Sequence, residues 1–222
     1  MTAVAIPLYD GFTALDVVGP YQMLAMTPGV SVTLVAETAG PVRDDQRSLT
    51  LHADAAFADV PTPDVVVVPG GPGSEHVLSG AVPEWVAAVH PTTTWTTSVC
   101  SGSLVLAAAG LLAGVPATCH YVHLETLALF GVETRAERVV EVPEARIITA
   151  GGVSSGIDMA LRLAELLSDR TIAQAVQLWT EYDPQPPFDS GAPGKATAEV
   201  RDLATSYELA ARLPAPGSQA AR

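Results

Sequence analysis

Cysteine is scarce in this chain: only Cys100 and Cys119 occur among 222 residues. A chain of this length can bury enough apolar surface to fold without disulfide staples. The sequence also lacks paired Cys-x-x-Cys and His-x-x-x-His spacings, which are the usual ligand patterns of zinc sites. We therefore expect both cysteines to be free thiols in a reducing compartment, and we predict no metal.

Basic residues are also few, with 11 Lys and Arg against 24 Asp and Glu and a formal net charge of −13. An acidic surface repels phosphate backbones and anionic lipid headgroups. The first residues lack a basic segment followed by an apolar stretch, and no run of about 18 apolar residues occurs. We therefore expect no nucleic-acid partner, no membrane association and a cytoplasmic location.

What the chain has in plenty is apolar residues, at 48% of the total. Continuous apolar runs of strand length alternate with segments of helical spacing, a pattern typical of an α/β fold with a parallel sheet covered on both faces. We expect kinking or breaking of the first helix at Pro20. The expected strands are 4–8, 30–35, 65–68, 95–99 and 147–150, with short, antiparallel edge strands at 49–53 and 138–142; the expected helices are 15–26, 82–90, 104–112, 122–130, 157–167 and 172–179.

The C-terminal part has a different composition. After Tyr182 the sequence DPQPPFDSGAPGKA is too rich in proline and glycine for a helix or a central strand. We expect an extended arm over residues 182–194, a helix over 197–213 and a frayed tail over 214–222. The predicted organisation is therefore one α/β domain, 1–194, followed by a C-terminal helix and flexible tail, 195–222.

The strongest local motif is TTSVCSGSLVLAAAGLL at residues 96–112, where a β-branched run meets Cys-Ser-Gly and then a small, apolar helix. This pattern is typical of a nucleophile elbow, in which Gly102 lets the helix and strand approach each other. A helix N-terminus favours the thiolate, so we expect placement alone to activate Cys100. The alternative is that Cys100 is buried as a small hydrophobe, the role that we expect for Cys119.

Two other strands end in glycine pairs at the same expected edge of the sheet. VVVVPGGPGS at 65–74 places Gly70 and Gly71 where their amides can act as oxyanion donors, although a plain tight turn explains the motif equally well. GGVSSGID at 151–158 places Gly152 and Val153 in the expected pocket wall. Asp158 falls in the first turn of a helix, where its charge complements the helix dipole.

An acid and a histidine complete the candidate residues. Asp16 follows Thr13 at capping-box spacing, so it is interpreted either as a helix cap or as a carboxyl that reaches the pocket and exchanges a proton with substrate. His120 follows the short strand-like sequence ATC; it is either a partner of Cys100 or an ordinary structural histidine. The remaining histidines are expected at the surface: His52, His76, His90 and His123.

In this order, the acid at Asp16, PGG, the Cys100 elbow, ATCH and GGVSSGID resemble the DJ-1/PfpI superfamily. LDVVGP, TSVCSGSLVLAAAGLL and VQLWTEYDPQPPFDSGAP are similar to its isonitrile (isocyanide) hydratase branch, and the resemblance spans residues 3–194. Two positions depart from that pattern: Ser101 stands where threonine is expected, and Tyr121 where tryptophan is common.

The resemblance implies a flavodoxin-like three-layer α/β sandwich that forms a homodimer and needs no cofactor. It also implies that Cys100 attacks the terminal carbon of an isonitrile, a small electrophile, to give a thioimidate that water converts to an N-substituted formamide. Asp16 would be the acid that handles the proton. Gly71 and Ser101 would line the electrophile site.

Other functions remain open because one fold hosts many activities. A glyoxalase or deglycase would act on a small reactive carbonyl, and a thiol redox sensor would use Cys100 without turnover. A transcription regulator is not expected, because residues 195–222 are too few for a helix-turn-helix pair and its support and the net charge is negative.

Overall fold

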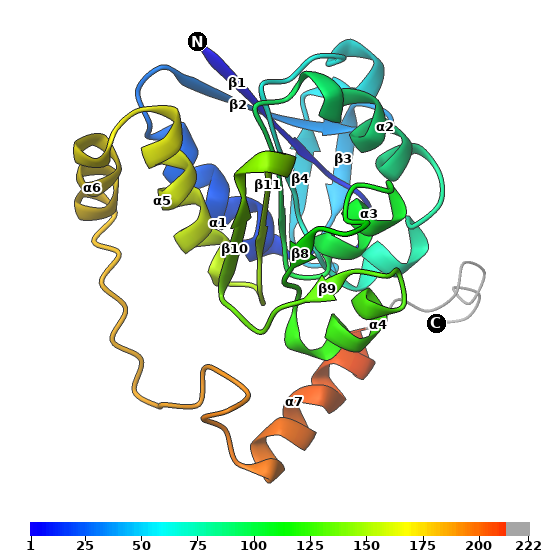
Figure 1. Cartoon of the computed structure of the whole chain (residues 1–222), viewed down its shortest axis with the longest axis vertical. Helices are drawn as coiled ribbons and strands as arrows, with labels where there is room; N and C mark the ends of the chain where they lie inside the picture. The colour runs from blue at the N-terminus through cyan, green and yellow to red at the C-terminus, as the bar shows by residue number, and fades with distance from the viewer. Residues whose placement is uncertain (212–222) are drawn as a thin grey trace.

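A seven-stranded sheet forms the centre of the computed structural model, which describes residues 1–211. All neighbouring strands run parallel except the edge pair β10 and β11. In spatial order the strands are β10 (Val139–Val142), β11 (Ile147–Ala150), β7 (Trp95–Val99), β6 (Val65–Val68), β1 (Thr2–Pro7), β2 (Val30–Ala36) and β5 (Ala55–Ala56). The carboxyl ends of β1, β6, β7 and β11 therefore meet at one edge of the sheet (Figure 1).

The continuous apolar runs form the centre of this sheet, as the sequence predicts. β6 and β11 are buried along their whole length, because helices cover both faces. The expected antiparallel edge strand is confirmed in β10. The other expected edge strand, β4 (Thr50–Ala53), instead pairs with β3 (Gly40–Arg43) in a separate two-stranded sheet, and β8 (Pro116–Ala117) pairs with β9 (Glu133–Thr134) in another.

The helices lie in two layers, one on each face of the sheet (Figure 1). α1 and α5 pack together on one face with α6 against α5, and α2 packs with α3 on the other, with α4 against α3. The helices are α1 (Ala14–Ala25), α2 (Ala81–Val89), α3 (Gly102–Ala108), α4 (Leu124–Ala128), α5 (Ser155–Leu167) and α6 (Arg170–Trp179). Short 3-10 turns are Phe57–Asp59, Pro72–His76, His90–Thr92, Tyr121–His123 and Pro143–Ala145.

Pro20 does not break α1, contrary to one of the outcomes expected there. Tight packing against α5 holds the helix together: a Cβ added to Gly19 would lie 3.0 Å from Ile157, and one added to Gly156 would lie 3.1 Å from the Pro20 ring. Close contact between the two helices therefore outweighs the local cost of the missing N–H.

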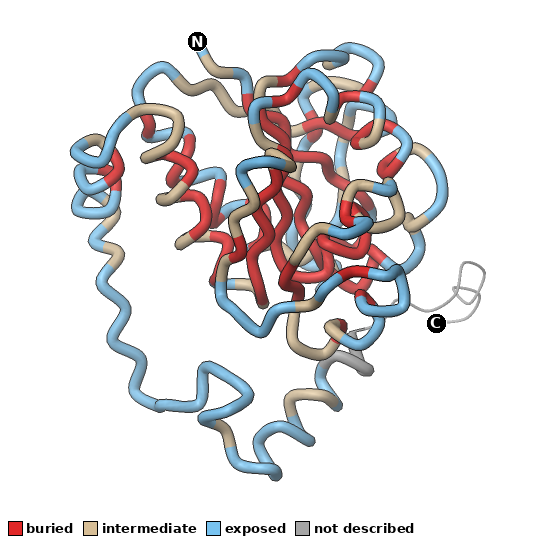
Figure 2. The backbone as a smooth tube through the Cα atoms, viewed as in Figure 1, coloured by how far each residue is buried: buried red, intermediate tan, exposed pale blue. Residues whose placement is uncertain are grey.

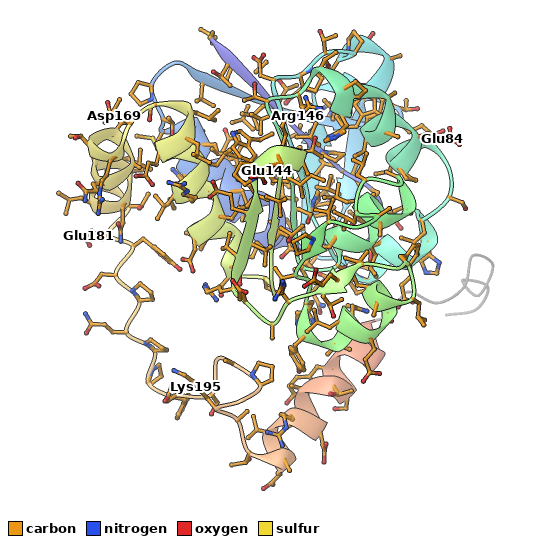
Figure 3. The ribbon with its side chains drawn as sticks, viewed as in Figure 1. Glu84, Glu144, Arg146, Asp169, Glu181 and Lys195 are labelled. Atoms are coloured by element: carbon orange, nitrogen blue, oxygen red, sulfur yellow. The ribbon has the colours of Figure 1, made fainter. Side chains whose placement is uncertain are left out.

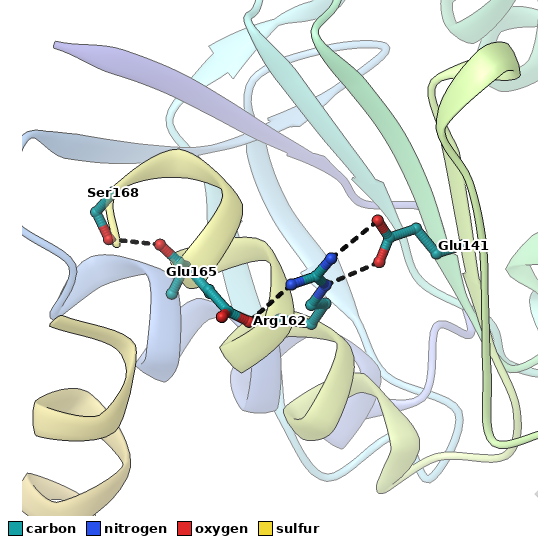
Figure 4. Close-up of polar contacts among 5 residues, drawn as sticks. Glu141, Arg162, Glu165 and Ser168 are labelled. Atoms are coloured by element: carbon teal, nitrogen blue, oxygen red, sulfur yellow. Dashed lines mark hydrogen bonds and ion pairs between the residues drawn. The ribbon is translucent and has the colours of Figure 1, made fainter. Parts of the chain in front are cut away.

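Arg162 ties α5 to the edge of the sheet (Figure 4). Its guanidinium binds both carboxylate oxygens of Glu141 on β10, at 2.8 and 3.2 Å, and also Glu165 at 2.7 Å. Such a bidentate pair fixes orientation even where solvent exposure keeps its contribution to stability small. The second half of α5 is thereby held to the edge strand β10.

The buried residues concentrate in the sheet, α1 and α5, whereas the C-terminal segment is exposed (Figure 2). Residues 182–197 form no helix or strand and lead from α6 to α7 (Ala198–Ala211). Glu181 and Lys195 mark the two ends of this extended segment in Figure 3. The expected tail, 214–222, lies outside the described residues. Across residues 1–211, no helix has both the length and the apolar character needed to span a membrane.

Candidate active site

Cys100 occupies the sharp turn between β7 and α3. Its backbone has φ of +58°, a left-handed conformation that non-glycine residues rarely adopt. Its N–H donates to the carbonyls of Ala150 and Gly151 at 3.1 and 2.9 Å, which anchors the turn to the end of β11. A Cβ on Gly102 would lie 2.3 Å from the Val68 carbonyl oxygen, so only glycine permits this approach of helix and strand. The predicted elbow is present.

The Cys100 thiol is buried, with only 6% of the residue exposed. Its pKa is raised well above the ordinary value, first by burial and next by the nearby charge of Asp16, whereas hydrogen bonds from the Val153 and Ser101 amides lower it. The expectation that placement alone would ionise this thiol is therefore wrong, because desolvation outweighs the helix N-terminus.

Asp16, whose charge contributes to this pKa shift, is fully buried. Its Oδ2 accepts a hydrogen bond from the Gly70 N–H at 2.9 Å, across 54 positions of sequence. The capping-box interpretation fails, since the Thr13 hydroxyl bonds Asp45 at 2.9 Å and caps no helical N–H. Asp16 instead lies at the carboxyl edge of the sheet, near the Cys100 turn.

The glycine pair joins the acid to the elbow. A Cβ on Gly70 would lie 2.8 Å from the Cys100 Cβ, so the residue that binds Asp16 also contacts Cys100. The Gly71 N–H donates to the Ser101 hydroxyl at 2.9 Å, and Ser74 donates to the same oxygen at 3.0 Å. Both glycine amides therefore donate to acceptors within the protein. One of the two interpretations of this motif was that these amides face an open crevice as oxyanion donors.

The turn between β11 and α5 supplies backbone donors instead. Val153 has φ of +29°, and its amide and that of Ser101 are directed at the Cys100 sulfur. Gly152 lies against the half-buried His120, because a Cβ there would be 2.5 Å from the ring Cδ2. The structure thus brings Gly152, Val153 and His120 to the Cys100 turn.

Asp158 lies one helical turn further on, within the first turn of α5. Its carboxylate pairs with Arg138 and accepts a hydrogen bond from the Tyr182 hydroxyl at 2.7 Å. This arrangement joins the beginning of α5 to the start of the C-terminal segment, in keeping with the structural role expected for Asp158.

Two residues that lie near Cys100 were not identified from the sequence as contributors to the site. The Cys119 thiol, treated only as packing, donates to the Cys100 carbonyl at 3.2 Å. Tyr9 lies two residues after the end of β1, and its buried hydroxyl donates to the Pro69 carbonyl at 2.7 Å. A polar side chain just beyond a strand, at the edge where Cys100 also lies, was the available signal for Tyr9.

Two of the expected surface histidines are not at the surface. His123 is 5% exposed, and its ring lies 6.1 Å from that of His120. His90 is half-buried and bonds Thr96 at 2.9 Å, and its pKa is lowered, first by burial and then by the charge of Arg146. Local sequence carries little information about either position, because loop packing decides both. Among residues 1–211, no group of three or more potential metal ligands is assembled.

The sequence profile of the DJ-1/PfpI family matches residues 2–166. The chain belongs to the DJ-1/PfpI family. Isonitrile hydratase from Pseudomonas putida is 40% identical to this family member over 198 residues, which cover 89% of this chain and 86% of that protein. The family assignment and the resemblance to the isonitrile hydratase branch are therefore confirmed.

Solved structures of DJ-1/PfpI proteins agree with the fold. A ThiJ/PfpI family protein from Pseudomonas syringae is similar with a TM-score of 0.87 and 36% identity, covering 95% of this chain and 89% of that one. DJ-1beta from Drosophila melanogaster has a TM-score of 0.73 and 20% identity, covering 81% and 97%; at this identity the likeness concerns the fold alone. The predicted flavodoxin-like three-layer α/β sandwich is confirmed.

Proposed function

We propose that this protein is an isonitrile hydratase, a cofactor-independent lyase that adds water to an isonitrile and releases an N-substituted formamide. The observation that carries the proposal is the meeting of thiol and acid at Gly70, which bonds Asp16 through its N–H and contacts Cys100 through its Cα side. The similarity to the P. putida isonitrile hydratase supplies the substrate class.

Cys100 and Asp16 work as a pair that holds one proton between them. Two negative charges this close in a buried site oppose each other, so the pair carries a single charge at neutral pH. An isonitrile carbon accepts a nucleophile when a proton is delivered to it, which requires a thiolate and an acid together. A singly protonated pair provides both.

The reaction then balances without any other reagent. The sulfur of Cys100 bonds the terminal carbon of R–N≡C while the thiol proton passes through Asp16 to that carbon, giving the thioimidate R–N=CH–S–Cys. Water adds to the thioimidate carbon, with Asp16 moving protons, and the C–S bond breaks. The products are R–NH–CHO and the free thiol.

The surrounding donors fit this scheme. The Val153 and Ser101 amides stabilise charge on the sulfur, and the strained Cys100 turn presents the side chain toward them. We assign to Gly71 and Ser101 the placement of the loop beside the electrophile, since the Gly71 N–H donates to the Ser101 hydroxyl at 2.9 Å and that hydroxyl donates to the Gly71 carbonyl at 3.2 Å. His120 and Gly152 form the wall on the other side.

The direct test is formamide production from cyclohexyl and aryl isonitriles by purified protein. Cys100→Ala and Asp16→Asn are each expected to lose activity at least a hundredfold, because each removes one half of the proton-sharing pair. Asp10→Asn is the matched control, since this carboxylate is exposed and pairs with Arg47 at the surface. Absence of formamide from the wild-type protein would remove the assignment.

Two alternatives are tested in the same preparation. Methylglyoxal is supplied and lactate is measured, with His120→Ala as the informative variant, because a glyoxalase needs a base that moves a carbon-bound proton. A redox sensor needs an exposed thiol of low pKa, whereas Cys100 is buried and its pKa is raised. Both roles require the thiolate, so turnover separates them: formamide production that Cys100→Ala abolishes supports the hydratase, and its absence favours the sensor.

We also propose that the protein is a homodimer, as the family resemblance implies. Large apolar side chains at the end of α6 and in the segment that follows are exposed, and burial against a second chain would remove them from water: Leu178, Trp179 and Phe188. Gel filtration decides the point, because an eluting mass equal to one 22.9 kDa chain would refute the dimer.

A further inference from the structure

Tyr9 and Asp16 bind opposite sides of a single peptide group. The Tyr9 hydroxyl donates to the Pro69 carbonyl oxygen at 2.7 Å, and the N–H of the next residue, Gly70, donates to Asp16 Oδ2 at 2.9 Å. The C=O and N–H of a trans peptide point in opposite directions within one plane. A donor that holds the carbonyl therefore also aims the N–H.

We propose that Tyr9 is a positioning residue for Asp16, which acts through the Pro69–Gly70 peptide by orienting and polarising the N–H that binds the carboxylate. The inference rests on the proposed function of Asp16 as the proton carrier. Hydrogen bonds in a chain strengthen one another by about 10–30%, so a hydroxyl on the carbonyl makes the opposite N–H a better donor. A better donor favours the ionised form of the carboxyl.

The surroundings make this peptide rigid. Tyr9 is 5% exposed and Asp16 is fully buried, so water does not substitute for either hydrogen bond. The Gly70 carbonyl is itself held by the Thr13 N–H at 2.9 Å. A Cβ on Gly70 would lie 2.5 Å from the Ser101 nitrogen, so the chain has no room to rotate around this position.

Tyr9 remains a donor over the working pH range. Burial, and then the charges of Asp16, Cys100 and Asp45, raise its pKa well above the ordinary value. The hydroxyl consequently keeps its proton, so its own ionisation does not contribute to the pH dependence of the reaction rate. Besides the pair, the titratable groups around this site are Asp45, Cys119 and His120, and a change at Tyr9 leaves all three in place.

The test compares the pH profiles of Tyr9→Phe and wild type. Phenylalanine keeps the ring and removes only the hydroxyl, so the acid limb of kcat is expected to move to higher pH, with a rate about threefold lower on that limb. KM and the plateau rate are expected to stay unchanged. Tyr21→Phe, on the 40% exposed Tyr21 of α1, is the matched control.

A second experiment avoids dependence on the folding of Tyr9→Phe. Replacing all five tyrosines with 3-fluorotyrosine strengthens the phenol as a donor, and the acid limb is then expected to move to lower pH. In the Tyr9→Phe variant, the same fluorotyrosine replacement should not change the pH at which the acid limb of kcat falls. An acid limb that does not respond to fluorination, or that coincides in Tyr9→Phe and wild type, would overturn the inference.

Failure of the proposed function is distinguishable from failure of this inference. The rate of Cys100 alkylation by iodoacetamide, assigned by peptide mass, depends on the same proton-sharing pair and needs no isonitrile. If the wild type makes no formamide, the hydratase assignment fails, while the alkylation profiles of wild type, Tyr9→Phe and Tyr21→Phe still decide whether Tyr9 acts on Asp16. Coincident alkylation profiles count against the positioning role.

Discussion

The strained backbone of Cys100 predicts that two substitutions at this position have the reverse of the usual stability order. Alanine normally stabilises a chain relative to glycine by about 0.5 to 1 kcal/mol, because glycine loses more backbone freedom on folding. At φ of +58° a Cβ carries a penalty of about 1 to 2 kcal/mol that glycine avoids. The difference leaves Cys100→Gly more stable than Cys100→Ala by about 0.5 to 1 kcal/mol.

Both variants lack the thiol and differ only in one Cβ, so the comparison does not involve the sulfur. For a chain of this size the expected difference in Tm is about 2 °C, measured by thermal unfolding at neutral pH. Ala175→Gly is the control, since Ala175 is exposed within α6, and there glycine should lower stability by about 1 kcal/mol. If Cys100→Gly melts at or below Cys100→Ala, the elbow stores no backbone strain and the reasoning is refuted.

Three further outcomes are expected. Ser101→Ala should destabilise the fold by about 1 to 3 kcal/mol in urea, because the buried Gly71 N–H loses its acceptor, and Ser101→Thr should restore most of that loss. Gly102→Ala should cost at least about 2 kcal/mol or prevent folding, because its Cβ would lie 2.3 Å from the Val68 carbonyl oxygen; a wild-type melting curve would contradict this packing. The pKa of Cys100 is higher in the folded chain than in the unfolded chain, so the unfolded chain loses this proton first as the pH rises. The contribution of Cys100 to the free energy of unfolding is therefore fully present below the ordinary thiol pKa of about 8.5 and declines above it. Between pH 7 and pH 10, wild type should therefore lose more stability in urea than Cys100→Ala, and equal losses would contradict the buried neutral thiol.

Much of the fold could be predicted because its signals are local. β6, β7 and β11 begin and end at the predicted residues, since short runs rich in β-branched residues strongly favour strands. Pro20 shows the limit of local rules: the sequence predicts a kink or break, and packing against α5 keeps the helix unbroken. β4 was expected at a sheet edge, yet it found its partner in β3, a choice that local pattern does not contain.

Some features of the candidate site could likewise be predicted from local sequence, and others could not. The Cys100 elbow is visible in the sequence because a nucleophile turn needs a strand, a small residue and a helix in immediate succession. The bond from Gly70 to Asp16 spans 54 positions and that from Tyr9 to Pro69 spans 60, so neither leaves a periodic pattern. The pKa of Cys100 is shifted in the direction opposite to the one expected, because a helix N-terminus can be seen in the sequence and desolvation cannot.

By itself, then, the sequence determined the order of strands and helices, the turn that presents Cys100 and the family to which the chain belongs, since each depends on neighbouring residues or on a shared motif. Only the tertiary structure decided which groups meet at the end of the sheet. Burial raised the pKa of the Cys100 thiol, the glycine amides found acceptors in Asp16 and Ser101, and Tyr9 came to hold the peptide between them. The physical reason is that desolvation and hydrogen-bond partners depend on distances through space, which form only when remote segments pack.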